Sequence, residues 1–342
     1  MRAAIYSPYL DTLGGGERYV LSVARVLLET GWAVDIQTSQ SDIVTKVKRR
    51  FGFDLTGAKC VDNIKRGDGY DLCFWLSDGS VPTLFARKNI VHFQRPFSDV
   101  DGSSLINKIK FFRINAVVVN SGFTKKWIDR EYPKESVVVY PPVDVTRLAP
   151  GRKENMILYV GRFSQLEQSK RQDILVGAFS KLVDKGLANW QLVLAGGSEV
   201  GRTDFVENLR KRSTNYPIQI VENPDFKKIV SLYSKARIFW SASGFGVDEL
   251  KLPQKLEHFG ISVVEAMASG AVPVVFDAGG HKEIVSNSES GYLWKTESEL
   301  LAKTLELVST KKRIKEMALR AQRESHKYSY ARFKKEILEL LN

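Results

Sequence analysis

A repeated order of strand, glycine-rich turn, helix and strand is the feature that most constrains how this chain folds. Near the start, residues 3–7 are a short apolar stretch, followed by Gly14–Gly16 and by residues 17–30, whose apolar side chains have helical spacing. Gly31 ends that helix, and residues 33–36 have the pattern of the next strand. This order is the building unit of an open parallel sheet, so we expect the α/β class.

The same order restarts in the second half, after the breaks at Pro141–Pro142 and Pro150–Gly151. Residues 157–161 predict a strand, residues 173–185 a helix, and residues 191–195 a strand that ends at a glycine pair. Two Rossmann-like domains are therefore expected. Because ligands bind beyond the carboxyl ends of parallel strands, we expect the two sheets to face a central cleft. Further strands are predicted at residues 72–76, 89–92, 116–120, 137–140, 218–222, 238–241 and 272–276.

Composition excludes several classes of protein. An apolar content of 43% is too high for a disordered chain, and two cysteines, Cys60 and Cys73, are too few for a secreted disulfide framework. The apolar run near the N-terminus is too short for a signal peptide, and no apolar run is long enough to span a bilayer as a helix. We therefore expect a cytoplasmic protein.

The formal net charge of +12 requires an explanation. The basic excess is spread over both halves, which leaves nucleic acid, an anionic membrane and a phosphate-bearing small substrate open as partners. Residues 46–50 form one basic cluster, and residues 105–114 combine cations with apolar side chains at near-helical spacing. Two interpretations of the second segment stay open: a helix on an anionic bilayer, or a core-facing helix with solvated lysines.

Two segments have the local pattern of a phosphate site. Gly15 and Gly16 lie between the first strand and the first helix, where the backbone can approach a ligand and the helix N-terminus offers free N–H groups. Arg162 ends the first strand of the second half, and Lys170 and Arg171 begin the next helix, so these cations can converge on a diphosphate. A tight turn without a ligand and a solvated basic face are the alternatives.

Residues 257–270 are the most informative segment. Glu257 precedes a predicted helix, and Glu265 lies within it between apolar neighbours. Gly260 lets the backbone pass close to a ligand, and the N–H groups after it face an anion. A carboxylate in the loop suits sugar hydroxyls, and one in the helix suits a ribose diol. Two surface glutamates are the alternative, although a carboxylate on an apolar helix usually has a partner.

Together these motifs resemble the retaining glycosyltransferases of family 4, which have the GT-B fold. Glu257 and Glu265 match the E-x7-E motif of that family within EHFGISVVEAMASGAVPVV, and DAGGHKEIV follows. GGGERYV, VGRF with SKRQDILVGAF, NSGFTKKW and YPPVD match further segments in the same order. The resemblance covers nearly the whole chain and is greatest to the lipid-linked-oligosaccharide mannosyltransferases and their prokaryotic relatives.

The resemblance implies an acceptor-binding domain over residues 1–145, a nucleotide-sugar-binding domain over residues 146–326, and a helix over residues 327–342 that packs back on the first domain. It implies retaining transfer of a hexose, with GDP-mannose as the favoured donor, to a glycan or lipid-linked acceptor. The nucleotide sugar is a co-substrate, and no cofactor or metal is implied. Asp99 and Asp101 have the spacing of a metal-binding pair, but they follow Pro96 in what we interpret as a polar loop.

Carried over residue by residue, the resemblance also implies roles in the reaction. Arg162 and Lys170 would neutralise the leaving diphosphate, and Glu257 would contact the donor sugar. Glu265 would hold the ribose, and His92 would hydrogen-bond the transferred sugar or orient the acceptor hydroxyl. The catalytic set is then His92, Glu257, Arg162 and Lys170, and the donor-binding set is Gly15, Gly16, Arg162, Lys170, Arg171, Phe259, Gly260, Ile261, Glu265 and Gly280.

Two departures from the family leave alternatives open. Residues 164–169 lengthen the gap between Arg162 and Lys170, so either Lys170 or Arg171 would touch phosphate. The long segment 244–256 would form a flap over the donor sugar, which keeps UDP-glucose and UDP-N-acetylglucosamine open as donors. A non-catalytic nucleotide- or nucleic-acid-binding protein is the alternative from another class. Both glutamates are present and no concentrated basic patch is visible, so nucleic acid is not an expected partner. Peripheral attachment to the inner face of a membrane stays open.

Overall fold

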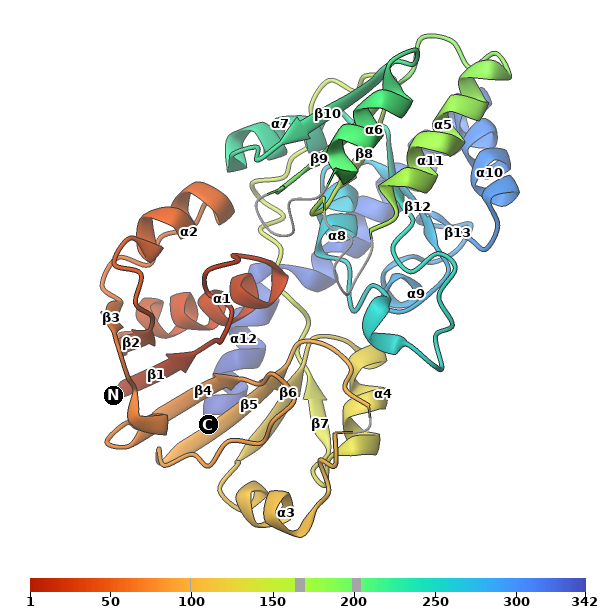
Figure 1. Ribbon diagram of the computed structural model, residues 1–342. Helices are drawn as coiled ribbons and strands as arrows, with labels where there is room; N and C mark the ends of the chain where they lie inside the picture. The colour runs from red at the N-terminus through yellow and green to blue at the C-terminus, as the bar shows by residue number, and fades with distance from the viewer. Residues whose placement is uncertain (99, 164–169, 199–203) are drawn as a thin grey trace. The chain divides into compact units, whose positions relative to one another are not determined.

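The computed structural model describes residues 1–98, 100–163, 170–198 and 204–342 (Figure 1). The chain forms two compact units, and each is described by itself. The first unit combines Met1–Pro142 with Tyr330–Asn342, and the second is Val143–Ser329. The chain passes from the first unit to the second after Pro142 and returns to the first after Ser329. Each of these boundaries is three residues away from the predicted one, at residue 145 or residue 326.

The first unit contains a seven-stranded parallel sheet with the order β3-β2-β1-β4-β5-β6-β7. The order reverses between β1 and β4, which is the arrangement that opens a crevice at the carboxyl ends of the strands. Ala3, Ala4 and Ile5 of β1 are completely buried, because helices cover both faces of the sheet. The strands are β1 Arg2–Tyr6, β2 Ala33–Gln37, β3 Lys59–Val61, β4 Leu72–Leu76, β5 Lys88–Phe93, β6 Ala116–Val119 and β7 Ser136–Val138.

Different helices cover the two faces of this sheet. One face packs against α1 Gly15–Glu29, α2 Ile43–Phe51 and α12 Tyr330–Leu341. The other packs against α3 Leu105–Phe111 and α4 Gly122–Glu131. The C-terminal helix α12 is held to α1 by an edge-on contact between Phe333 and Tyr19 and by an ion pair of 2.8 Å between Lys334 Nζ and Glu29 Oε2.

Helix α1 begins at Gly15, two residues before the predicted start. Gly14 is the N-cap, and its N–H donates to Glu17 Oε2 at 2.7 Å, so the Glu17 carboxylate caps the helix from inside its own first turn. Gly15 and Gly16 are therefore the first helical residues rather than part of a loop. Glycine has no side chain to show helical periodicity, which is why the sequence pattern placed the start too late.

The second unit contains a six-stranded parallel sheet with the order β10-β9-β8-β11-β12-β13. Trp240 of β11 packs edge-on against Phe179 on one face, while its neighbour Phe239 lies beside Tyr233 on the other. The strands are β8 Met156–Val160, β9 Gln191–Gly196, β10 Ile218–Glu222, β11 Ile238–Ser241, β12 Val272–Phe276 and β13 Tyr292–Trp294. The helices are α5 Gln172–Asp184, α6 Phe205–Ser213, α7 Phe226–Lys235, α8 Ile261–Ala268, α9 His281–Ile284, α10 Glu297–Ser309 and α11 Lys311–Ser325.

Within the described ranges, none of the helices is both long enough and apolar enough to cross a membrane.

Candidate functional site

An ion pair between Lys170 and Glu257 is the centre of the candidate site in the second unit. Lys170 lies just before α5, and Glu257 lies in the loop before α8. Their Nζ and Oε2 atoms are 2.7 Å apart, and the side chains are only 13% and 16% exposed. Burying two charges is costly unless they are well paired, so this arrangement is typical of a site that handles charge.

The ion pair determines the protonation of Glu257. Burial alone would raise the pKa of this carboxyl, but the adjacent Lys170 ammonium outweighs that effect and lowers the pKa to about 2. Glu257 is therefore a carboxylate, able to accept hydrogen bonds, at every pH near neutrality.

A turn at Gly279 and Gly280 holds the loop that carries Glu257. The Gly280 N–H donates to the Glu257 carbonyl at 2.8 Å, and Gly279 has a φ of +55°, in the left-handed region. A Cβ added to Gly280 would lie 2.5 Å from Phe259 Cα and 2.7 Å from the His258 carbonyl oxygen. The two backbone segments are thus in direct contact, which only glycine permits.

Glu265, the second glutamate of the motif, lies in α8 and is almost completely buried. Its Oε2 accepts a hydrogen bond of 2.9 Å from the Tyr233 hydroxyl of α7. The expected partner of this carboxylate is therefore a tyrosine 32 residues earlier in the chain, a position that local sequence pattern does not connect to it. At the start of α8, Gly260 is the N-cap with a φ of +113°, and Ile261 is the first helical residue. Phe259, just before them, packs edge-on against Tyr328.

His281 is a site residue that the sequence patterns did not single out. Its side chain is completely buried, and its Nδ1 lies 2.8 Å from the Phe276 carbonyl. Its Nε2 is buried and has no hydrogen-bond partner among the described residues. Burial lowers the pKa of this imidazole, and the negative charge of Glu257 opposes that effect. A neutral ring with a spare acceptor therefore lies in the electrostatic field of Glu257.

The three predicted cations of the second unit have different surroundings. Arg162 is exposed, and its carbonyl accepts from Gln172 Nε2 at 2.8 Å. The Arg171 guanidinium is held by the Asp173 carboxylate at 3.1 Å and by the Phe245 carbonyl at 2.7 Å. Of the two adjacent residues, Lys170 is thus the one placed beside Glu257. The insertion at 164–169 lies outside the described residues.

The segment 244–256 contacts the glycine turn. Glu249 Oε2 accepts from the Gly279 N–H at 3.4 Å and pairs with Lys282 Nζ at 2.8 Å. The expected flap is therefore tied to the turn that supports the Glu257 loop.

His92, the predicted catalytic residue of the first unit, is completely buried in the sheet core. Its ring stacks on Tyr19 with centroids 4.0 Å apart. Nδ1 lies 3.1 Å from the Val118 carbonyl and Nε2 lies 2.7 Å from the Gln94 side-chain amide. Burial lowers the pKa of His92 to about 4, so the ring is neutral. Both ring nitrogens of His92 thus lie within hydrogen-bond distance of protein atoms, and the predicted hydrogen bond to a sugar would have to replace one of these contacts.

The described residues contain no group of three or more His, Cys, Asp or Glu side chains placed to hold a metal ion. Asp99 of the Asp99–Asp101 pair lies outside the described part of the chain.

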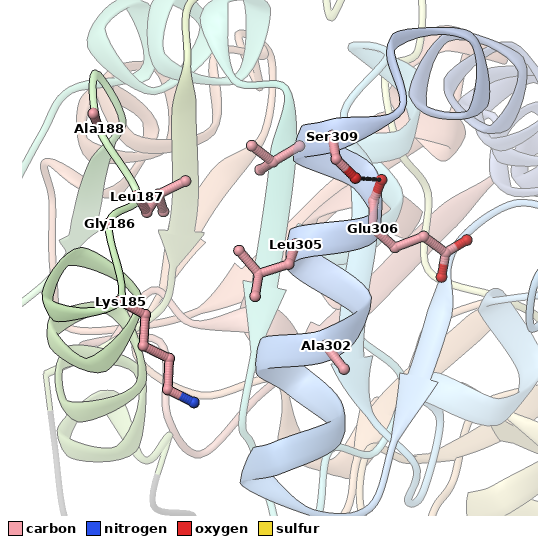
Figure 2. Close-up of a pocket in the computed structure, with 9 residues that line it drawn as sticks. Lys185, Gly186, Leu187, Ala188, Ala302, Leu305, Glu306 and Ser309 are labelled. Carbon is pink, nitrogen blue, oxygen red and sulfur yellow. Dashed lines mark hydrogen bonds between the residues drawn. The ribbon is translucent and has the colours of Figure 1, made fainter.

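A shallow depression elsewhere in the second unit contains none of these candidate residues. It lies between α10 and the loop that follows α5 (Figure 2). It lacks the convergent cations that a diphosphate requires. The side chains at its edges include those of Lys185, Leu187, Ala302, Leu305, Glu306 and Ser309.

The pKa of Glu257 predicts how stability depends on pH. Its value of about 2 in the folded protein lies below the ordinary 4.5, so its stabilising contribution is complete above pH 4.5 and is lost as the pH falls towards 2. We expect the free energy of unfolding of the protein and of a Glu257→Gln variant to converge over this range. Urea unfolding at a series of acidic pH values measures this. A difference that stays constant down to pH 2 would contradict the assignment.

Comparison with known proteins places this site in a family. A profile described as "Glycosyl transferases group 1" matches residues 144–327, more than half of the chain. The GDP-Man:Man(3)GlcNAc(2)-PP-Dol alpha-1,2-mannosyltransferase of Dictyostelium discoideum is 28% identical over 244 residues, covering 66% of this chain and 46% of that protein. The alpha-1,3/1,6-mannosyltransferase ALG2 of Rhizomucor pusillus is 26% identical over 220 residues, covering 54% and 48%. The chain thus spans about half the length of these relatives.

A solved structure of HepE from Anabaena, in complex with UDP and glucose, superimposes with a TM-score of 0.77 at 16% identity, covering 99% of this chain and 98% of that one. This likeness concerns the fold, and it confirms the predicted GT-B class. The predicted family is confirmed as well, because the profile match covers more than half of the chain. The matched region contains the Lys170–Glu257 pair, Glu265 and the glycine turn. The chain is a member of the group 1 glycosyl transferases.

Proposed function

We propose that this protein is a retaining glycosyltransferase that moves a hexose, with mannose favoured, from a nucleotide-diphosphate sugar to a glycan or lipid-linked acceptor. The observation that carries the proposal is the buried Lys170–Glu257 ion pair, held against the Gly279–Gly280 turn within the family region.

The proposed roles follow from the charges of the site. As the bond between the sugar and the diphosphate breaks, negative charge grows on the leaving phosphate, and the Lys170 ammonium and Arg162 guanidinium stabilise it. The N–H groups in the first turn of α8, which has no side-chain cap, add fixed donors. Lys170 then exchanges part of its contact with Glu257 for phosphate, which leaves the Glu257 carboxylate to accept from sugar hydroxyls.

GDP-mannose is the favoured donor because both curated relatives reported above have mannosyltransferase in their names, and one names GDP-Man. UDP-glucose is the principal alternative, since HepE was solved with UDP and glucose. We further propose action at the cytoplasmic face of a membrane, where a lipid-linked acceptor is presented, without metal, cofactor or nucleic acid.

A donor screen with a matched pair of variants tests this function. We expect GDP-mannose to raise the melting temperature and to be slowly hydrolysed. Glu265→Gln should weaken nucleotide binding about ten- to a hundredfold, because a charged acceptor buried beside Tyr233 is lost. Tyr233→Phe keeps the carboxylate and should weaken binding less. Glu316→Gln, a change of the same type on exposed α11, is the control.

If UDP-glucose rather than GDP-mannose raises the melting temperature, UDP-glucose is the donor and GDP-mannose is not. A protein that no nucleotide sugar stabilises would contradict the function. Unchanged donor affinity in Glu265→Gln would contradict the role of that residue.

A further inference from the structure

Helix α3 and its C-cap residue, Phe112, expose large apolar side chains to solvent. Leu105, Ile106, Ile109 and Phe112 are 76%, 68%, 59% and 90% exposed. At about 100° per residue, these four positions fall within an arc of about 120° on the helix surface. The opposite side of the helix anchors it, since Phe111 and the following Ile114 are buried against the sheet. We call the four exposed residues the α3 patch. Its exposure shows that the expectation of a core-facing apolar stripe is wrong for these residues.

Cations border the α3 patch on both sides. Lys108 lies beyond one edge of the arc and Lys110 beyond the other, while Arg113 lies inside the arc, about 20° from the same edge as Lys110. Lys110 Nζ donates to the Val81 carbonyl at 2.9 Å, and Arg113 Nε donates to the Leu84 carbonyl at 2.6 Å. These bonds fix the helix on the loop after β4, so its apolar side chains remain outside. Residues 104–114 contain no acidic side chain.

The other basic cluster of the first unit, residues 46–50, differs from the α3 patch in its ion pairing and in the burial of its apolar side chains. Its helix α2 covers the opposite face of the sheet from α3 (Figure 1). Lys46 pairs with Asp42 at 3.1 Å, and Lys48 pairs with Asp54 at 3.2 Å. The two apolar side chains at its core, Ile43 and Val47, are completely buried. Helix α2 is thus an ordinary charged surface helix, and the α3 patch is a different kind of surface.

We propose that the α3 patch inserts into the interfacial region of an anionic lipid bilayer. The four side chains present no polar atom that would need a hydrogen bond, and the bordering cations match the phosphate headgroups of such a surface. A protein partner would more often be met by a mixture of polar and apolar groups. This inference deepens the proposed function and rests on it for the identity of the acceptor, because insertion at α3 would bring the first unit to a lipid-linked substrate.

Vesicle binding by the full chain tests the proposal. The probes are vesicles of phosphatidylcholine alone and of equal parts phosphatidylcholine and phosphatidylglycerol. We expect sedimentation with the anionic vesicles, weakened by added salt. The double variant Ile109→Gln with Phe112→Gln should reduce partitioning about tenfold or more, and Lys108→Gln should reduce binding to anionic vesicles by a smaller factor. The double variant Leu305→Gln with Leu319→Gln removes two exposed leucines of the second unit and is the matched control.

A fluorescent label reports insertion directly. With Cys60→Ser, Phe112→Cys becomes the accessible thiol, because Cys73 is buried. An environment-sensitive dye at position 112 should shift its emission to shorter wavelength on anionic vesicles. Binding with no such shift, or equal binding by the Ile109/Phe112 variant, would overturn the proposal. So would self-association through this patch without vesicle binding, which would make it a protein interface.

Donor hydrolysis in solution separates this inference from the proposed function. The Ile109/Phe112 variant should hydrolyse the nucleotide sugar at the rate of the unmodified protein. If the variant loses vesicle binding but still hydrolyses the donor, the result bears only on the α3 patch. If the unmodified protein does not hydrolyse the donor, the result contradicts the proposed function and leaves the membrane proposal untouched.

Discussion

Glu257→Gln is expected to reduce kcat/KM for sugar transfer about a hundred- to a thousandfold while leaving the protein folded. Glutamine fills the same volume and can still accept a hydrogen bond from Lys170 Nζ, so the loop is retained. What is lost is the negative charge between Lys170 and His281, and with it the charged acceptor that faces the sugar. Steady-state transfer assays, together with the melting temperature, measure both parts of the expectation.

Glu297→Gln is the matched control for this change. Glu297 also pairs with a lysine at 2.7 Å in the same unit, but it lies at the start of α10 on the surface, where an ion pair contributes at most about 1 kcal/mol. Turnover should be unchanged in that variant. Normal turnover in Glu257→Gln would remove this residue from the mechanism. If Glu257→Gln does not fold, Glu257→Asp, which keeps the negative charge, would be assayed in its place.

Gly280→Ala is expected to have the second large effect, through backbone geometry. The added Cβ would lie within 2.5–2.7 Å of backbone atoms of His258 and Phe259, and backbone cannot move aside as the end of a flexible side chain can. The loop carrying Glu257 must therefore shift. We expect a loss of about 1–3 kcal/mol in the free energy of unfolding. Transfer should fall strongly as well, because a small displacement of a charged group at a reaction centre is costly.

Gly177→Ala is the matched control, which tests whether the loss of stability and transfer depends on the position of the glycine rather than on any exchange of glycine for alanine. Gly177 lies inside α5, and the nearest atom to an added Cβ is the end of the Arg212 side chain, at 3.3 Å. Alanine there should be neutral or stabilise the helix by about 0.5–1 kcal/mol. Chemical denaturation measures the free energy of unfolding of both variants, and transfer assays measure their activity. A Gly280→Ala protein with normal stability and normal transfer would show that the turn does not support the site.

Secondary structure was predictable where the local pattern is strong. The buried strands β1, β4, β8 and β12 have unbroken apolar runs, and the structure places them within a residue or so of the prediction. Strand β3, Lys59–Val61, is partly exposed and only three residues long, so no apolar run marks it. Its place in the sheet depends on pairing with β2, a contact that is not local.

The site was predictable in its motifs and not in its contacts. The spacing of Glu257 and Glu265, and the glycines that accompany them, are features of a continuous segment. The Lys170–Glu257 pair joins positions 87 residues apart, and the Tyr233 bond to Glu265 joins positions 32 apart. In the sequence, His281 simply follows a glycine pair, and nothing in the local pattern marks it as a site residue. Its burial beside Glu257, which only the structure shows, identifies it as one.

The sequence by itself determined the order of strands and helices, the glycine turns and the family, because these depend on short-range periodicity and on motifs within continuous segments. The tertiary structure decided which residues are buried, paired or exposed. It placed Lys170 rather than Arg171 beside Glu257, enclosed both ring nitrogens of His92, and left the apolar side of α3 in solvent. The physical reason is that burial and charge pairing depend on neighbours from distant parts of the chain, which local pattern does not encode.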